Sequence, residues 1–189
     1  MTTCMTALLR GLEGQAQMWV SGRPWEADHE LAWLWCLAKI APDGPAVECG
    51  VKDGGSLACW AAAREDRGPL YGVDIKAGPG AASLWEGYHY KVTSLQMASW
   101  DAAAIIEGPV AFCFLDAAHS EPGFPQDIVV WPGKIMPGGV IAFHDYDVWK
   151  PNVVVKTYVD AWQKEAQWES LGRVGSLIAF RRPSWGERE

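Results

Sequence analysis

Short apolar runs without alternating polarity recur along the chain, and they predict strands buried on both faces of a parallel sheet. They cover residues 46–49, 70–75, 110–116 and 140–144, with a weaker run near 90–92. Helical patterns separate these runs, over 56–64, about 96–106 and about 126–135, and Pro151 is expected to start a last helix. The pattern therefore predicts alternating strands and helices, with a parallel sheet at the centre.

The two ends of the chain complete this prediction. Residues 1–44 are expected to form a helical segment, in which Leu31, Leu34, Trp35 and Ala38 follow the stripe of an amphipathic helix. Two β-type runs in 168–181, around residues 172–175, predict a hairpin. We expect residues 1–189 to form one domain whose core, 45–181, is a three-layer α/β/α sandwich. Its Rossmann-like sheet would have seven strands, mostly parallel, with a C-terminal antiparallel hairpin.

Length, charge and cysteine usage narrow the class of protein. The chain has 189 residues, 49% of them hydrophobic, which suits one globular domain. Its net charge of -7 and its lack of a Lys/Arg cluster disfavour nucleic-acid and membrane-surface partners. We see neither a membrane-spanning run nor a secretory signal. The five cysteines are odd in number and show no CxxC spacing, so reduced core residues in a cytoplasmic protein are expected.

Acids and histidines end two of the predicted strands. Asp116 and His119 follow the run 110–116, and His144 and Asp145 follow the run 140–144. Because the carboxyl ends of parallel strands meet at one edge of the sheet, where open α/β folds bind their ligands, we expect these four side chains to share one crevice.

A glycine-rich turn after the first strand predicts a nucleoside cofactor. Gly50, Gly54 and Gly55 let the backbone pass close to a ligand, while Ser56 would cap the next helix or bind a carboxylate. Asp74 ends the second strand, 19 residues after Gly55, and an acid there suits the two hydroxyls of a ribose.

These motifs, read in order as E-x-G-x-x-x-G-x-S from Glu48, then Asp74, then 112–146, resemble the class I S-adenosylmethionine-dependent methyltransferases. More narrowly, the chain resembles the catechol-type and macrolide-sugar O-methyltransferases and the cephalosporin-hydroxylase-like proteins, over about 45–180. The terminal hairpin favours the same fold. The resemblance implies that Gly50 and Gly54 surround the methionine part of the cofactor, with Ser56 on its carboxylate. It also implies a further set of contacts: Asp74 on the ribose, Ser94 on adenine after the third strand, Asp116 near the sulfonium, and Glu48, Gly55 and Ile75 beside them.

The resemblance also implies a divalent cation. Catechol-type enzymes hold it with the acid after strand 4 and a pair after strand 5, which here are Asp116, His144 and Asp145. The first of the pair is usually a carboxylate, so histidine is a departure. It leaves Mg²⁺ possible and shifts preference toward Mn²⁺, Fe²⁺ or Zn²⁺. His119 stands where those enzymes carry a lysine base. It is interpreted as the catalytic base with Asp116, as a ligand, or as a turn residue bonded to Asp127 or the backbone.

The leading hypothesis is methyl transfer from S-adenosylmethionine to a hydroxyl of a small molecule, assisted by a divalent metal. One alternative is an oxidative enzyme, in which Asp116, His119 and His144 form a two-histidine-one-carboxylate iron site. Another is a non-catalytic nucleoside-binding module. The compact chain leaves little material to enclose an acceptor, which favours a homodimer or an N-terminal lid. Tyr146 and Trp149 are candidates for an aromatic wall beside the acceptor or for packing.

Overall fold

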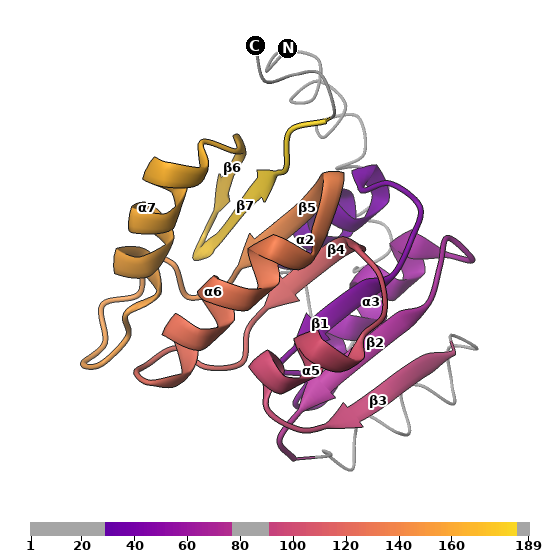
Figure 1. Cartoon of the computed structure of the whole chain (residues 1–189), viewed down its shortest axis with the longest axis horizontal. Coiled ribbons are helices and arrows are strands. Elements are labelled where there is room, and N and C mark those ends of the chain that lie inside the picture. Colours follow the sequence, from indigo (N-terminus) through magenta and orange to yellow (C-terminus); the bar gives the residue numbers. More distant parts are fainter. Residues whose placement is uncertain (1–28, 77–90, 185–189) are drawn as a thin grey trace.

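A single sheet organises the molecule, which we describe from a computed structural model covering residues 29–76 and 91–184. Within those residues the strand order is β3-β2-β1-β4-β5-β7-β6 (Figure 1). The strands are β1 (Ala46–Cys49), β2 (Leu70–Asp74), β3 (Val92–Gln96), β4 (Val110–Leu115), β5 (Ile135–Phe143), β6 (Glu169–Val174) and β7 (Leu177–Arg181). Strands β1 to β5 pair in parallel, whereas β7 is antiparallel to both β5 and β6. The predicted seven-stranded sheet with a C-terminal hairpin is confirmed.

Helices cover both faces of this sheet. They are α2 (His29–Ile40), α3 (Gly55–Arg64), α5 (Ser99–Ile105), α6 (Gly123–Lys134) and α7 (Val155–Ala166). Figure 1 shows α5, α6 and α7 in front of the sheet and α2 and α3 behind it. Successive residues of the central strands point to opposite faces, so that Phe112 and Phe114 pack in the core under α2 and α3, and Cys113 and Leu115 in the core under α5 to α7. The fold therefore has the three predicted layers.

Helix α2 is joined to α3 by a buried guanidinium group. Arg64 is 0% exposed and donates hydrogen bonds to the carbonyl oxygens of Ala38 (3.3 Å), Ala41 (3.1 Å) and Gly44 (3.0 Å). Carbonyls at the end of a helix have no partner within the helix, so this side chain satisfies groups that burial would otherwise leave unpaired. The contact fixes the end of α2 against α3, which matters because α2 also reaches the site described below.

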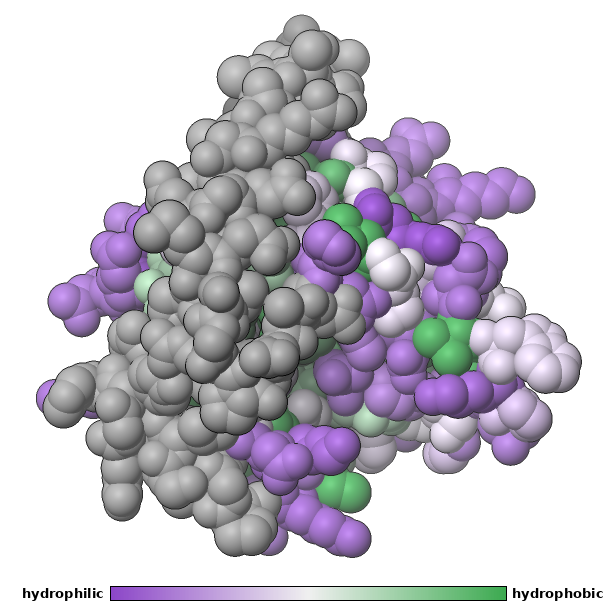
Figure 2. Space-filling view, turned by 180° about the vertical axis from the view of Figure 1, so that it is seen from behind, coloured by the Kyte–Doolittle hydropathy of each residue, from purple (hydrophilic) through white to green (hydrophobic). Residues whose placement is uncertain are grey.

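The described surface is mixed in character. On the face seen from behind, the part not occupied by grey residues is mainly hydrophilic, with separate hydrophobic residues between (Figure 2). Among the described helices, none has the length and apolar character that crossing a bilayer requires. The four described cysteines, Cys36, Cys49, Cys59 and Cys113, are all buried in the core.

Several predicted boundaries differ from the structure because tertiary hydrogen bonds override local pattern. Strand β3 runs from Val92 to Gln96 instead of 90–92, so that Ser94 lies inside the strand and α5 starts later, at Ser99. Strand β5 extends back to Ile135, since Gly138 donates to the carbonyl of Arg182 (2.9 Å).

Two further boundaries also differ from the prediction. Helix α7 begins at Val155 and not at Pro151, and the hairpin turns at Gly175 and Ser176, with residues 172–174 still in β6. Residues 1–28 of the predicted N-terminal helical segment and position 90 lie outside the described residues.

Candidate active site

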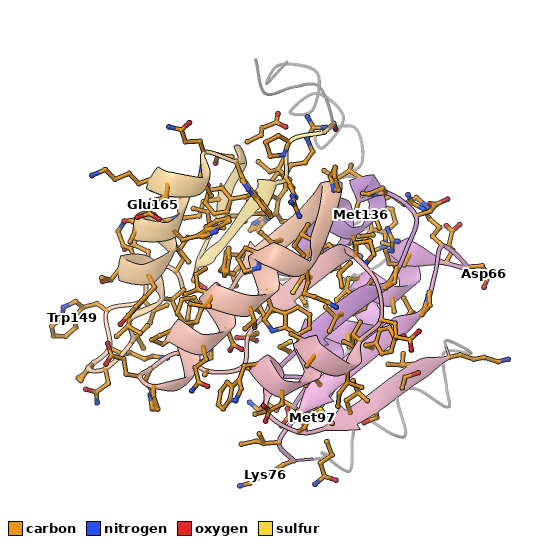
Figure 3. All side chains as sticks on the ribbon, viewed as in Figure 1. Asp66, Lys76, Met97, Met136, Trp149 and Glu165 are labelled. Atoms are coloured by element: carbon orange, nitrogen blue, oxygen red, sulfur yellow. The ribbon has the colours of Figure 1, made fainter. Side chains whose placement is uncertain are left out.

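A cavity of about 670 Å³ opens at the carboxyl edge of the parallel strands. This volume lies within the range of small-molecule sites. Met97, which lines the cavity, and Lys76 lie at this edge, whereas Met136 lies at the opposite end of the sheet (Figure 3). The predicted site residues that line the cavity are Gly50, Asp74, Ile75, Asp116, His119, His144 and Asp145. The ends of β1, β2, β4 and β5 thus bring together residues that the sequence separates widely.

Gly50 allows the turn after β1 to pass directly beside Asp116. Its φ is +93°, and a Cβ at this position would lie 2.2 Å from the carbonyl oxygen of Asp116. Its N–H donates to the carbonyl of Val73 (2.8 Å). Only glycine fits here, so the loop keeps the cavity open above the ends of β1 and β4. Gly54 has φ +81° and precedes the first turn of α3, where it acts as the N-cap.

Glu48 and Ser56 bond to each other instead of facing the cavity. The Ser56 hydroxyl donates to Oε1 of Glu48 (2.6 Å), and the indole N–H of Trp60 donates to Oε2 (2.5 Å). Glu48 is 0% exposed, and burial raises its pKa to about 8 even though both hydrogen bonds favour the charged form. The predicted Ser56 cap is not formed, because α3 begins from Gly54 without a side-chain cap.

Asp74 is held at the end of β2 by backbone donors. Its two carboxylate oxygens accept hydrogen bonds from the N–H groups of Lys52 (2.8 Å) and Lys76 (2.9 Å). The carboxylate is thus fixed at the cavity wall, with Ile75, 67% exposed, beside it. Ser94 does not join them, since it is exposed in the middle of β3. That end of the cavity is lined by a stretch that sequence reasoning missed, residues 97–100, which includes Trp100.

Asp116, His119, His144 and Asp145 form what we call the carboxylate–imidazole cluster. Nε2 of His119 lies 3.0 Å and Nδ1 of His144 lies 3.1 Å from the same oxygen, Oδ1 of Asp116. Asp145 completes the group, with oxygens 3.7 Å from Nε2 of His119 and 3.5 Å from Nδ1 of His144. Asp116, His119 and His144 each offer one donor atom, and these three atoms lie within 4.8 Å of one another. Three donor atoms this close together could bind one metal ion. The predicted convergence of these side chains is therefore found.

The charges within this cluster are interdependent. Burial alone would raise the pKa of Asp116, but hydrogen bonds from His119 and His144 outweigh it and lower that pKa. Burial would likewise lower the pKa of His144, yet its contacts with Asp116 and with Glu30 raise the pKa to about 9. The Asp116 carboxylate and the His144 imidazole therefore each favour the charged form of the other.

Backbone contacts explain how the four side chains are aimed. The N–H of His144 donates to the carbonyl of Leu115 (3.0 Å), extending the β4·β5 pairing past the end of the strand. Asp145 has φ +54°, which turns the chain sharply after His144. The carbonyl of His119 accepts from the N–H of Val154 (2.9 Å), so the loop before α7 lies against it. The suggested bond from His119 to Asp127 is absent, because Asp127 is hydrogen-bonded to Ser99.

Sequence reasoning missed two partners of His144. Glu30, in the first turn of α2, places Oε2 3.1 Å from Nε2 of His144, and the Ser176 hydroxyl lies 3.4 Å from the same nitrogen. No local motif marks either residue. The suggested aromatic wall is not formed by the described residues, since neither Tyr146 nor Trp149 lines the cavity and Trp149 is 96% exposed at the tip of its loop (Figure 3).

Solved structures with this fold include several methyltransferases. The O-methyltransferase TomG of Streptomyces achromogenes, involved in tomaymycin synthesis and determined with S-adenosylmethionine, is 19% identical with a TM-score of 0.63, covering 93% of this chain and 89% of that chain. The O-methyltransferase of Bacillus cereus, determined with S-adenosylhomocysteine, is 17% identical (TM-score 0.61; 93% and 91% covered). An rRNA methylase of Streptococcus thermophilus is 13% identical (TM-score 0.60; 78% and 93% covered). At these identities the likeness shows the fold alone.

The sequence itself gives the family. No match was found among curated protein sequences. A family model described as a methyltransferase domain matches residues 47–146, which is more than half of the chain and spans the glycine turn, Asp74 and the carboxylate–imidazole cluster. With the strand order and the cavity at the sheet edge, this match shows that the chain belongs to the S-adenosylmethionine-dependent methyltransferase family.

Proposed function

We propose that this protein transfers the methyl group of S-adenosylmethionine to a hydroxyl of a small molecule, and that Asp116, His144 and Asp145 hold a divalent cation that assists. The observation that supports this most is the position of the carboxylate–imidazole cluster in the same cavity as Asp74. A cofactor fixed at Asp74 would extend along the sheet edge toward Asp116, so its reactive end would meet the cluster.

The cofactor half of the cavity suits a nucleoside. Asp74 would accept hydrogen bonds from the two ribose hydroxyls. Met97 and Trp100 offer apolar and aromatic surface for the base, and Ile75 would be covered by it. Gly50 lets the methionine part approach the backbone. Direct contacts from Glu48, Gly54, Gly55, Ser56 and Ser94 stay predictions, because these residues are not among those that line the described cavity.

The donor atoms of the cluster fit a divalent cation. Two carboxylates and the imidazole of His144 are ordinary ligands of first-row metals, and the nitrogen donor favours Mn²⁺, Fe²⁺ or Zn²⁺ over Mg²⁺. A bound cation would supply positive charge that stabilises the acceptor oxygen as it loses its proton. The side chains of Asp116 and Asp145 are only 27% and 17% exposed. This partial burial would limit the screening of the cation's charge by water.

His119 is proposed as the base. In the neutral ring Nε2–H would donate to Oδ1 of Asp116, which orients the imidazole and leaves Nδ1 as the nitrogen that accepts a proton. The hydroxyl proton of the acceptor would pass to this imidazole while the methyl carbon leaves the sulfonium sulfur and bonds to the acceptor oxygen in line. S-adenosylhomocysteine, a neutral thioether, then leaves.

A second candidate function is favoured by the inclusion of His119 in the metal-ligand spacing. Asp116, His119 and His144 together have the composition of the two-histidine-one-carboxylate sites that bind Fe²⁺ in oxygen-dependent enzymes. In that case His119 would be a ligand and not a base, and O₂ would be consumed without loss of the methyl group from the cofactor.

Methyl-labelled S-adenosylmethionine tests the two candidates. The purified protein is incubated with panels of catechols, phenols and sugars, and with ribosomal RNA fragments, with and without EDTA. We expect label in a small hydroxyl compound, loss of transfer in EDTA and recovery with Mn²⁺. The net charge of -7 disfavours the RNA. Transfer to RNA, or full turnover in EDTA, would contradict the proposal, and Fe²⁺-dependent O₂ consumption would favour the oxidative function.

A further inference from the structure

The carboxylate of Glu30 joins three distant parts of the fold at His144. One oxygen, Oε2, lies 3.1 Å from Nε2 of His144, and the other, Oε1, accepts the backbone N–H of Ser176 in the β6–β7 turn. Its side chain is only 17% exposed. Glu30 lies in α2, before the 47–146 segment that the family model matches, so nothing in that match assigns it a role.

The turn of the hairpin is shaped around this carboxylate. Gly175 has φ +57°, and a Cβ at this position would lie 2.1 Å from Oε1 of Glu30. The close approach places the Ser176 N–H on one oxygen and leaves the other directed at His144. The contact with Ser176 uses one oxygen of Glu30 to join α2 to the hairpin, and the second oxygen makes a separate contact with the imidazole of His144.

The two nitrogens of His144 therefore face opposite carboxylates. Nε2 faces Glu30, while Nδ1 faces Asp116 at 3.1 Å and Asp145 at 3.5 Å. An imidazole that binds a metal must keep its proton on the other nitrogen, and a carboxylate is a strong acceptor for that proton. Glu30 thus selects the tautomer in which Nε2 carries the hydrogen and Nδ1 offers a lone pair to the cluster.

We propose that Glu30 is a positioning residue for His144, which holds the ring by accepting Nε2–H and so presents Nδ1 as a ligand to a divalent cation. This inference rests on the proposed function, because it assigns Glu30 to the cation site formed by Asp116, His144 and Asp145. It does not make Glu30 a ligand, since the imidazole ring lies between Glu30 and the rest of the cluster.

Mn²⁺ binding to the full chain, measured by calorimetry and by loss of the free-ion electron paramagnetic resonance signal, tests this role. Glu30→Ala should weaken Mn²⁺ binding about 10- to 100-fold, the usual effect of removing the carboxylate behind a histidine ligand. Glu30→Gln, which keeps an acceptor oxygen of the same reach but not the charge, should lose less. S-adenosylhomocysteine affinity should stay within about twofold, because Asp74 and residues 97–100 follow β2 and β3, whereas Glu30 contacts His144 after β5, three strands from β2 in the sheet.

Glu65→Ala is the matched control. Glu65, which follows α3, is also a carboxylate that pairs with α2, since it lies 2.7 Å from the Lys39 ammonium. Lys39 is at the opposite end of α2 from Glu30, and Glu65 is exposed. If loosening α2 were enough to weaken the cation site, this variant would lose Mn²⁺ affinity too. We expect it to bind Mn²⁺ as the wild type does, and an equal loss in both variants would overturn the proposal.

Imidazole ¹⁵N spectra provide a readout that mere destabilisation of α2 would not change in the same way. The chain has four histidines, so the His144 signals can be assigned with single variants. In the protein saturated with diamagnetic Zn²⁺, Nε2–H should be hydrogen-bonded and slow to exchange with solvent in the wild type, and it should exchange faster in Glu30→Ala. If the wild type binds no cation, the proposed function fails. If it binds one, and Glu30→Ala binds it equally or exchanges Nε2–H at an unchanged rate, this inference alone fails.

Discussion

Gly50 and the backbone of Asp116 lie so close that no side chain fits between them. A Cβ on Gly50 would be 2.2 Å from the carbonyl oxygen of Asp116, and the φ of +93° is itself unfavourable for other residues. The glycine turn thus serves the packing of β1 against β4 as much as the approach of a ligand. A larger residue would displace Asp116, on which the whole cluster depends.

We predict that Gly50→Ala lowers the free energy of unfolding by about 2–4 kcal/mol, because backbone strain and a steric clash add at this position. Urea denaturation followed by circular dichroism measures it. Gly133→Ala is the matched control, since Gly133 is exposed in α6 and a Cβ added there would meet nothing within 4 Å. That change should be neutral or stabilise by up to about 1 kcal/mol. Equal stability of the two variants would contradict this role of Gly50.

Asp74 gives the sharpest test of where the cofactor binds. Asp74→Ala should weaken S-adenosylhomocysteine binding about 10- to 100-fold, the effect of losing two hydrogen bonds to ribose hydroxyls. Calorimetry on the folded variant measures this, with Asp66→Ala as the control, since Asp66 is an exposed acid at an edge of the molecule away from Lys76 and Met97 (Figure 3). NAD should bind to neither. Unchanged affinity in Asp74→Ala would remove Asp74 from the site.

His119 is predicted to act in the chemical step and not in cofactor binding. His119→Ala should lower turnover about 100-fold or more and abolish the low-pH limb of the rate profile, while S-adenosylmethionine affinity stays nearly intact. Steady-state rates across pH, with the labelled cofactor, check both expectations. A variant that keeps its rate and profile would leave His119 a structural turn residue, and a matching fall in Mn²⁺ affinity would make it a ligand.

Glu48 should make stability depend on pH. Burial raises its pKa from 4.5 to about 8, so the folded protein keeps a proton that the unfolded chain releases. This contribution to stability is complete below about pH 4.5 and is lost as the pH rises through 8. The loss amounts to at most about 1.4 kcal/mol for each pH unit within that window.

Glu48→Gln tests this, because the amide cannot titrate, while its oxygen can still accept from the Trp60 indole N–H and its NH2 group can donate to the Ser56 hydroxyl. Denaturant unfolding at about pH 5 and about pH 8 should show the wild type losing more stability than the variant across that interval. A wild type and a variant with parallel pH profiles would show that Glu48 is already ionised in the folded protein.

The sequence was sufficient to predict the sheet and its chemical edge. Residues 110–115 and 140–143 are buried on both faces, so their apolar character shows directly in the sequence, and the charged groups that follow them had to lie at the carboxyl edge. Asp116, His119, His144 and Asp145 were therefore identifiable as neighbours before their contacts were known.

The features that escaped prediction depend on contacts between distant segments. Glu30 and His144 are 114 residues apart, and nothing local to Glu30 distinguishes it from an ordinary first-turn acid. Ser94 was misplaced because the short, partly exposed β3 has a weak pattern, and its pairing with β2 sets where it ends. Trp149 shows the converse, since an aromatic residue beside a site proved to be 96% exposed and outside the cavity.

The proposed chemistry depends above all on a divalent cation in the carboxylate–imidazole cluster, next to the cofactor. The most direct test is an anomalous difference map from crystals grown with Mn²⁺ and S-adenosylhomocysteine. We predict one strong peak within about 2.3 Å of an oxygen of Asp116 and a nitrogen of His144. S-adenosylhomocysteine well ordered in the cavity, with no anomalous peak at the cluster, would contradict the proposed cation site.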